Sequence, residues 1–190
     1  MERIFFSSAA ILLLCCSTLL AQGTAAKKPA DLHPVVVMET SMGTMEITLD
    51  AGKAPVTVKN FLSYVEEAFY DSTIFHRIIP NFMIQGGGLT VSYSQKAAHD
   101  PIVNEAKNGL LNKRGTIAMA RRNDPNSATS QFFINHVDNS SLDYSEKNPG
   151  YAVFGEVTRG IEVVDKIAAV KTGAQDAPRE PVVILSVKVK

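Results

Sequence analysis

The sequence predicts a mainly β domain, in which two helices cover the ends of a closed or nearly closed antiparallel sheet. Eight strand-like runs separated by turn signals support this fold, whereas only two segments have the apolar spacing of a helix. Two of the runs alternate apolar and polar residues, which is typical of strands with one buried face. The pattern of residues leaves both a barrel and a sandwich open.

The strands follow one another with short turns at several places. Residues 35–38 and 45–49 are joined by a turn at 41–43, which predicts an antiparallel hairpin. In residues 45–49 the apolar side chains occupy the odd positions, and residues 185–190 alternate in the same way. The other predicted strands are residues 73–78, 82–86, 116–120, 131–135 and 151–157.

The two helices are predicted from spacing and from one proline. Pro55 suits a first helical position because its missing N–H would be unpaired there in any case. Apolar residues follow it at helical spacing, namely Val58, Phe61, Leu62 and Val65. Residues 161–170 have the same spacing after Gly160 and give the second helix.

Residues 86–115 are mostly not periodic and are expected to form a long loop. The loop would begin with three glycines at 86–88. A phosphate-binding loop is not indicated, because no Gly-Lys-Ser/Thr follows and no helix begins there.

Residues 1–26 have the pattern of a secretory signal peptide, with a short apolar run at 9–20. Small residues allow cleavage after Gly23 or after Ala26. The apolar run is shorter than the ~20 residues of a spanning helix, so stable membrane association after cleavage is not expected. The segment at 27–33 is then a polar linker, and residues 34–190 form one domain.

The composition indicates which binding partners and which cellular compartment to expect. Lys and Arg number 19 and Asp and Glu number 19, so the chain has no net charge that would attract nucleic acid. Both cysteines, Cys15 and Cys16, fall in the predicted signal peptide, and a mature chain without thiols suits an oxidising compartment. We expect a monomer in a bacterial periplasm, with secretion from the cell as the alternative.

The residues that could carry chemistry lie in two strings. The first is FHRIIPNFMIQGGG at 75–88, and the second is GTIAMAR at 115–121, which resumes as SQFFIN at 130–135. These strings closely resemble the cyclophilins, a family of peptidyl-prolyl cis–trans isomerases. The resemblance extends over residues 35–190 and is greatest to the bacterial periplasmic members. It implies a closed eight-stranded antiparallel barrel capped by two α-helices, with the active site in a groove on the outer face.

The resemblance also implies the activity and the partners. The substrates would be proline-containing segments of folding exported proteins, and no cofactor is implied. Rotation about an X–Pro bond breaks no bond to the substrate, so neither a nucleophile nor a metal is required. At the twisted transition state the imide nitrogen regains its lone pair, and a donor aimed at that nitrogen accelerates rotation.

Ten residues are carried over from the family pattern. The catalytic residues would be Arg77, as the donor to the imide nitrogen, with Phe82, Gln85 and Phe133. The substrate-binding residues would be Met83, Ala120, Arg121, Gln131, Leu142 and Tyr151.

Strand alternation agrees with this placement. If residues 131–134 form a strand, Gln131 and Phe133 share one face while Phe132 and Ile134 share the other. One face can then line a groove while the other fills the barrel.

The sequence leaves two alternatives to isomerisation. A binding module or chaperone could hold proline segments without turning them over, but it would not require a donor at the imide nitrogen. A hydrolase triad of Ser72, His76 and Asp71 is disfavoured, because such close neighbours rarely converge and no nucleophile elbow is present.

The remaining histidines, His33, His99 and His136, lack metal-ligand spacing. A glycosylation sequon at Asn139 matters only in a eukaryotic secretory pathway.

Two departures from the better-known eukaryotic cyclophilins lead to a prediction about cyclosporin. Where those members have Trp before the leucine of the groove, this chain has Ser141 before Leu142, and Tyr151 stands where they have His. We expect the isomerase to be active but only weakly inhibited by cyclosporin. The measurement is inhibition of X–Pro peptide exchange, and inhibition at nanomolar concentration would contradict the prediction.

Overall fold

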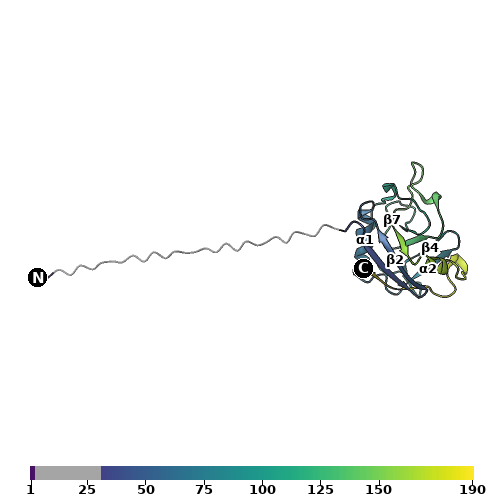
Figure 1. Cartoon of the computed structure of the whole chain (residues 1–190), viewed down its shortest axis with the longest axis horizontal. Helices are drawn as coiled ribbons and strands as arrows, with labels where there is room; N and C mark the ends of the chain where they lie inside the picture. Colours follow the sequence, from purple (N-terminus) through teal and green to yellow (C-terminus); the bar gives the residue numbers. More distant parts are fainter. Residues whose placement is uncertain (3–30) are drawn as a thin grey trace. The chain divides into compact units, whose positions relative to one another are not determined.

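The sheet is a closed barrel of eight antiparallel strands (Figure 1). In chain order the strands are β1 (Val35–Thr40), β2 (Gly43–Leu49), β3 (Thr73–Ile79), β4 (Met83–Thr90), β5 (Thr116–Met119), β6 (Phe132–Asn135), β7 (Val153–Arg159) and β8 (Val183–Val189). Around the barrel they follow the order β1-β2-β7-β5-β6-β4-β3-β8. Closure of the sheet decides between the two architectures that the residue pattern left open.

The computed structural model describes residues 1–2 and 31–190. The predicted signal peptide therefore lies almost wholly outside the described residues, as do positions 27–30 of the predicted linker. In the part of the chain that is described, no helix has the length and apolar character needed to cross a membrane.

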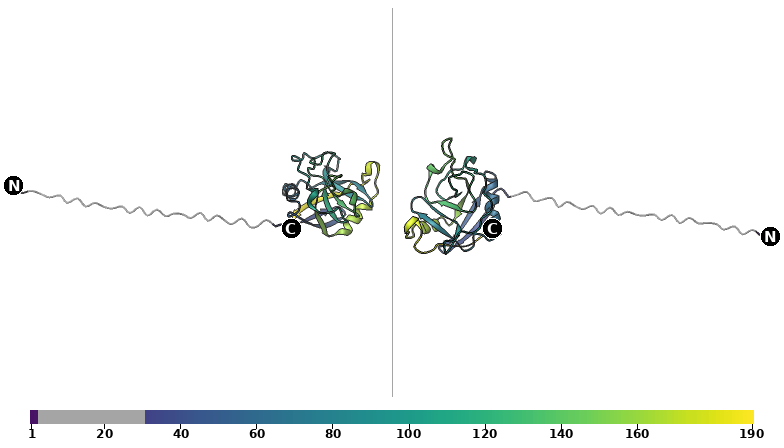
Figure 2. Two further views of the ribbon diagram at one scale, coloured as in Figure 1. Left: turned by 90° about the horizontal axis from the view of Figure 1, so that it is seen from above. Right: turned by 180° about the vertical axis from the view of Figure 1, so that it is seen from behind.

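Two α-helices pack against the strands, as predicted (Figure 2). Helix α1 (Pro55–Glu66) begins at the expected proline and contacts β8, while α2 (Ile161–Ala168) contacts β2, β3 and β4. Three short 3₁₀ turns complete the regular structure, namely η1 (Ala106–Asn108), η2 (Ser140–Leu142) and η3 (Ala174–Asp176).

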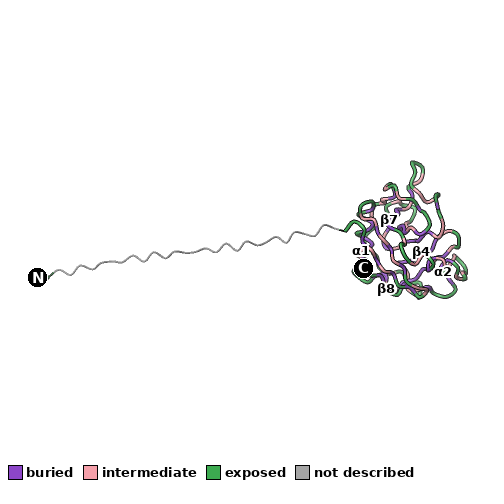
Figure 3. Tube along the Cα trace, in the orientation of Figure 1, coloured by how far each residue is buried: buried purple, intermediate pink, exposed green. Residues whose placement is uncertain are grey.

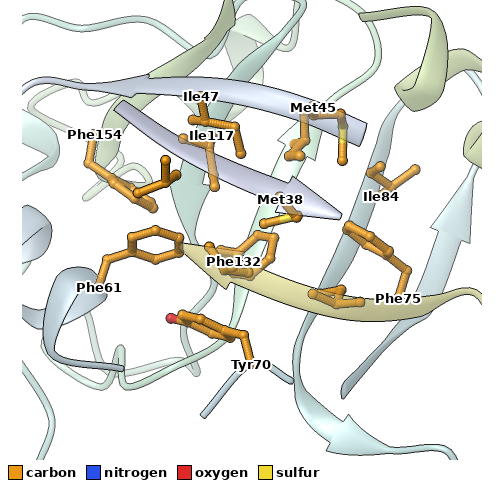
Figure 4. Packing of buried hydrophobic residues seen from close by; sticks show 14 of the residues in the cluster. Met38, Met45, Ile47, Phe61, Tyr70, Phe75, Ile84, Ile117, Phe132 and Phe154 are labelled. Atoms are coloured by element: carbon orange, nitrogen blue, oxygen red, sulfur yellow. The ribbon is translucent and has the colours of Figure 1, made fainter. Parts of the chain in front are cut away.

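The core is formed by inward-facing strand residues together with the apolar faces of both helices (Figure 3). An aromatic cluster lies at its centre, where Phe61 of α1 points toward Phe132 and Phe154 (Figure 4). The ring centroids of Phe61 and Phe154 are 5.2 Å apart, and those of Tyr70 and Phe132 are 5.5 Å apart. Phe132 and Ile134 are both fully buried here, as strand alternation predicted.

The three glycines at 86–88 belong to β4, so the prediction that the strand ends and a loop begins at Gly86 is wrong. A Cβ on Gly86 would lie 2.9 Å from the carbonyl oxygen of Ile74, and one on Gly87 would lie 2.6 Å from the Phe132 ring. Gly87 also has a φ of +80°, which favours glycine. The glycines let β4 approach its neighbours closely, which is a strand use of glycine that resembles a loop signal in sequence.

The long segment that follows β4 is anchored to α1 through Glu105. One carboxylate oxygen of Glu105 accepts the backbone N–H of Val56 at 3.1 Å, and the other accepts the N–H of Thr57 at 2.8 Å. The hydroxyl of Thr57 donates to the second oxygen at 2.7 Å. Because the first N–H groups of a helix have no partner within the helix, this carboxylate caps α1 and fixes the segment to it.

Candidate functional site

Register across four strands gathers the site on the outer face of the barrel. Arg77 of β3 is paired with Gln85 of β4, Gln85 with Phe133 of β6, and Phe133 with Ala118 of β5. Residues directly opposite each other in neighbouring strands point to the same face of a sheet. These four side chains therefore form one row, on the face opposite to the buried Phe132.

A hollow of about 130 Å³ lies over this row. Nine of the ten predicted site residues line it, namely Arg77, Phe82, Met83, Gln85, Ala120, Arg121, Phe133, Leu142 and Tyr151. The tenth, Gln131, lines an adjoining hollow of about 190 Å³ that shares Gln85, Ala120 and Arg121 with the first. The amide nitrogen of Gln85 donates to the side-chain oxygen of Gln131 at 3.0 Å and joins the two hollows.

The floor of the hollow is an apolar cluster separate from the barrel core. Met83 and Phe133 are almost fully buried in it, and Phe82, Leu142 and Tyr151 pack around them. Ala118 and Val153 also belong to the cluster, although they are not among the ten predicted site residues. The signal for both is the pairing of β5 with its neighbours, which places Ala118 opposite Phe133 and Val153 opposite Ala118.

Arg77 lies at the edge of this apolar floor with its side chain 43% exposed. Its Nε lies 3.4 Å from a carboxylate oxygen of Asp176, whose side chain is 45% exposed. Such a long and exposed ion pair contributes little free energy. In the described residues, no hydrogen bond from the two terminal nitrogens to another protein group is present. The guanidinium thus keeps donors available beside an apolar hollow.

Arg121 is fixed by its neighbours. Its guanidinium lies over the ring of Tyr151, 4.5 Å from the ring centroid, and Nε donates to the carbonyl oxygen of Gly150 at 3.0 Å. Nη1 donates to the carbonyl oxygen of Arg122 at 2.9 Å. Tyr151 in turn packs edge-on against Phe133, with centroids 5.6 Å apart. Arg121 therefore forms part of a rigid wall between the two hollows.

A buried polar network supports the wall on the side of Phe82. The amide of Asn139 donates to the carbonyl oxygen of Phe82 at 2.8 Å and to Oδ1 of Asn135 at 2.7 Å. Asn135 donates in turn to the hydroxyl of Thr116 at 2.9 Å. Asn139 is only 8% exposed and both its amide hydrogens are used, so the sequon at this position is not open to glycosylation in the folded domain.

The hydrolase alternative has no geometric support. Nδ1 of His76 is buried without a hydrogen-bond partner among the described residues, so it is linked neither to Ser72 nor to Asp71. Burial, helped by the positive charge of Arg77, lowers the pKa of His76. Within the described part of the chain, no group of three or more His, Cys, Asp or Glu side chains is placed to hold a metal ion.

Comparison with known proteins identifies the family. The family model described as cyclophilin-type peptidyl-prolyl cis–trans isomerase/CLD matches residues 35–189. The chain belongs to the cyclophilin family. It is 56% identical over 162 residues to a peptidyl-prolyl cis–trans isomerase of Acinetobacter baylyi, an alignment that covers 83% of this chain and 86% of that protein. It is 54% identical over 162 residues to peptidyl-prolyl cis–trans isomerase B of Escherichia coli, covering 82% of this chain and 99% of that protein.

The fold of this cyclophilin also matches a solved member of the family. A cyclophilin-type isomerase of Cryptosporidium parvum, crystallised in the presence of the dipeptide Ala-Pro, superposes with a TM-score of 0.70 at 26% identity. The superposition covers 82% of this chain and 98% of the other. This cyclophilin is therefore a peptidyl-prolyl cis–trans isomerase, and its substrates are proline-containing peptides.

The polar network behind Phe82 gives a prediction for stability. Asn139→Ala removes the donor to the Phe82 carbonyl and leaves Oδ1 of Asn135 without its partner in a buried site. We expect the free energy of unfolding to fall by about 1–3 kcal/mol, measured by urea denaturation. The matched control is Ser140→Ala at the exposed neighbouring position, for which a change within about 0.5 kcal/mol is expected. Equal stability of the two variants would contradict the prediction.

Proposed function

We propose that Arg77 is the residue that accelerates rotation of the X–Pro bond in this isomerase. The observation that carries this proposal is the presence of Arg77 in the same hollow as Phe82, Met83 and Phe133. An apolar site holds the proline ring, and a guanidinium beside it can donate to the imide nitrogen as the peptide leaves planarity. The donor strengthens its bond only when resonance is lost, so it stabilises the transition state selectively.

The other site residues hold the substrate on either side of the rotating bond. Phe82, Met83, Phe133 and Leu142 contact the proline ring in this proposal. Gln85 hydrogen-bonds the substrate backbone, and its bond to Gln131 fixes the orientation of its amide. The residues that precede proline lie over Ala120, Arg121 and Gln131, where the adjoining hollow opens. The fixed guanidinium of Arg121, stacked on Tyr151, supports a role in shaping this part of the site.

We also propose that the protein is exported and assists the folding of proteins in the periplasm. The pattern of residues 1–26 supports a signal peptide, followed by a linker at 27–33 and the isomerase domain at 34–190. Similarity at 54–56% identity to isomerases of four bacteria supports a bacterial cyclophilin, and its place in the periplasm is proposed from the signal-peptide pattern. Because its charges are balanced, we propose that the protein does not bind nucleic acid. We also propose that it acts as a monomer.

The role of Arg77 is tested by Arg77→Ala. We expect kcat/KM for an X–Pro peptide to fall roughly 10- to 150-fold, because one charge-assisted hydrogen bond contributes about 1.5–3 kcal/mol. Peptide binding, followed by NMR titration, should be retained because the apolar floor is intact. Arg159→Ala removes an exposed guanidinium outside the groove and serves as the matched control. Unchanged exchange in Arg77→Ala would refute the assignment.

Export is tested by expressing the full chain in a Gram-negative host and fractionating the cells. We expect the protein in the periplasmic fraction, with a mature amino terminus at Thr24 or Lys27, read by mass spectrometry. A chain that lacks residues 1–26 should stay in the cytoplasm and keep its isomerase activity. An uncleaved chain in the cytoplasmic or membrane fraction would contradict the proposal.

A further inference from the structure

His136, the residue that follows β6, binds the turn that carries Phe82 into the groove. The backbone N–H of His136 donates to the carbonyl oxygen of Phe82 at 2.9 Å. The ring of His136 accepts the backbone N–H of Asn81 at Nδ1, at a distance of 3.0 Å. His136 thus binds the backbone of two consecutive residues, Asn81 and Phe82, in the turn between β3 and β4.

The bond to Asn81 fixes the protonation state of the ring. An amide N–H is only a donor, so Nδ1 of His136 must be unprotonated to accept it, and the ring proton lies on Nε2. Nε2 lies 3.1 Å from a carboxylate oxygen of Asp165 in α2. The ring of His136 therefore acts as an acceptor toward the turn.

The charged groups around the ring hold it in place from two elements. Asp165 also binds Nη2 of Arg114 at 2.9 Å, and Nη1 of Arg114 donates to the carbonyl oxygen of His136 at 2.7 Å. The backbone N–H of Arg114 donates to Asp138 at 2.8 Å. The side chain of His136 is only 18% exposed, so these contacts leave the ring little freedom to move.

The turn depends on this support because its backbone is unfavourable without it. Asn81 has a φ of +58°, in the left-handed region that costs free energy for a residue with a side chain. Asn81 is exposed, whereas Phe82 packs on the apolar floor of the groove. Loss of the bond at Nδ1 would let Asn81 relax and would shift Phe82, although Asn139 and the His136 backbone would still hold its carbonyl oxygen.

We propose that His136 is a positioning residue for the isomerase, which sets Phe82 against the substrate proline through the hydrogen bond that its Nδ1 accepts from Asn81. The inference rests on the proposed role of Phe82 in the groove. Because Phe82 contacts the proline ring in both planar and twisted states, the effect falls mainly on KM and little on kcat.

The test compares His136→Phe with His136→Asn. Phenylalanine keeps an aromatic ring but has no acceptor, whereas Oδ1 of asparagine is placed like Nδ1 and can accept the same hydrogen bond. At about pH 8 we expect His136→Phe to raise KM about 2- to 12-fold, the factor that one neutral hydrogen bond represents, and His136→Asn to restore most of the loss. Urea denaturation of each variant at the assay temperature shows whether the variant is folded, so that a change in KM is not mistaken for a loss of folded protein.

The division of the effect between KM and kcat separates positioning from a merely structural role. His136→Phe should raise KM and leave kcat nearly unchanged, and His136→Asn should bring KM back toward the wild-type value. His99→Gln, which alters a histidine bound to Glu67 and stacked on Tyr64, should keep the wild-type KM and kcat. An unchanged KM in His136→Phe, or a raised KM that persists in His136→Asn, would overturn the inference.

Phe82→Ala distinguishes this inference from the proposed function. A large rise in KM in Phe82→Ala with no effect of the His136 variants would reject the positioning role of His136 and leave the proposed role of Phe82 intact. Wild-type kinetics in Phe82→Ala would reject the proposed role of Phe82 in the groove, and the inference with it.

Discussion

The groove depends on one constraint, the register of β3, β4, β6 and β5 in a closed barrel. Because side chains alternate between faces, a fixed register assigns every second residue of these strands to the core and the rest to the outer surface. Phe132 and Phe133 are adjacent in sequence and belong to two separate apolar clusters for this reason. A slip of one residue would exchange them, bury a polar row and expose the aromatic core. The tight packing of β4 glycines against neighbouring strands holds the register.

Much of this arrangement could be predicted from the sequence. Both helices and the eight strands follow from spacing and turns. The family resemblance of the strings at 75–88, 115–121 and 130–135 predicted seven of the nine residues that line the hollow, and the same resemblance predicted Leu142 and Tyr151 outside them. What could not be predicted depends on contacts between distant segments. The glycines of β4 look like a loop until their neighbours are known, and Val153 joins the site only through its pairing with Ala118. Tertiary packing decided each of these cases.

The apolar surface of the groove is supported by hydrogen-bonded polar groups that lie beneath it. A groove that holds a proline ring needs apolar side chains, but the loops that carry Phe82 and Leu142 cannot be fixed by apolar contact alone. Hydrogen bonds from Asn139 and His136 satisfy the backbone of the turn that bears Phe82, and the backbone N–H of Leu142 donates to the carbonyl oxygen of Asn139. Buried amide networks of this kind specify one conformation because an unpaired member is costly. The shape of the apolar surface is thus set by polar groups behind it.

The cap that Glu105 places on α1 has a mechanical consequence for the second hollow. The segment that contains Glu105 also contributes Gln95 and Pro101 to the border of that hollow. An outward swing of this border that carried Glu105 with it would strip the acceptors from the N–H groups of Val56 and Thr57. The bonds between Glu105 and α1 therefore resist widening of the second hollow. The size of substrate that this hollow admits depends on a helix that does not line it.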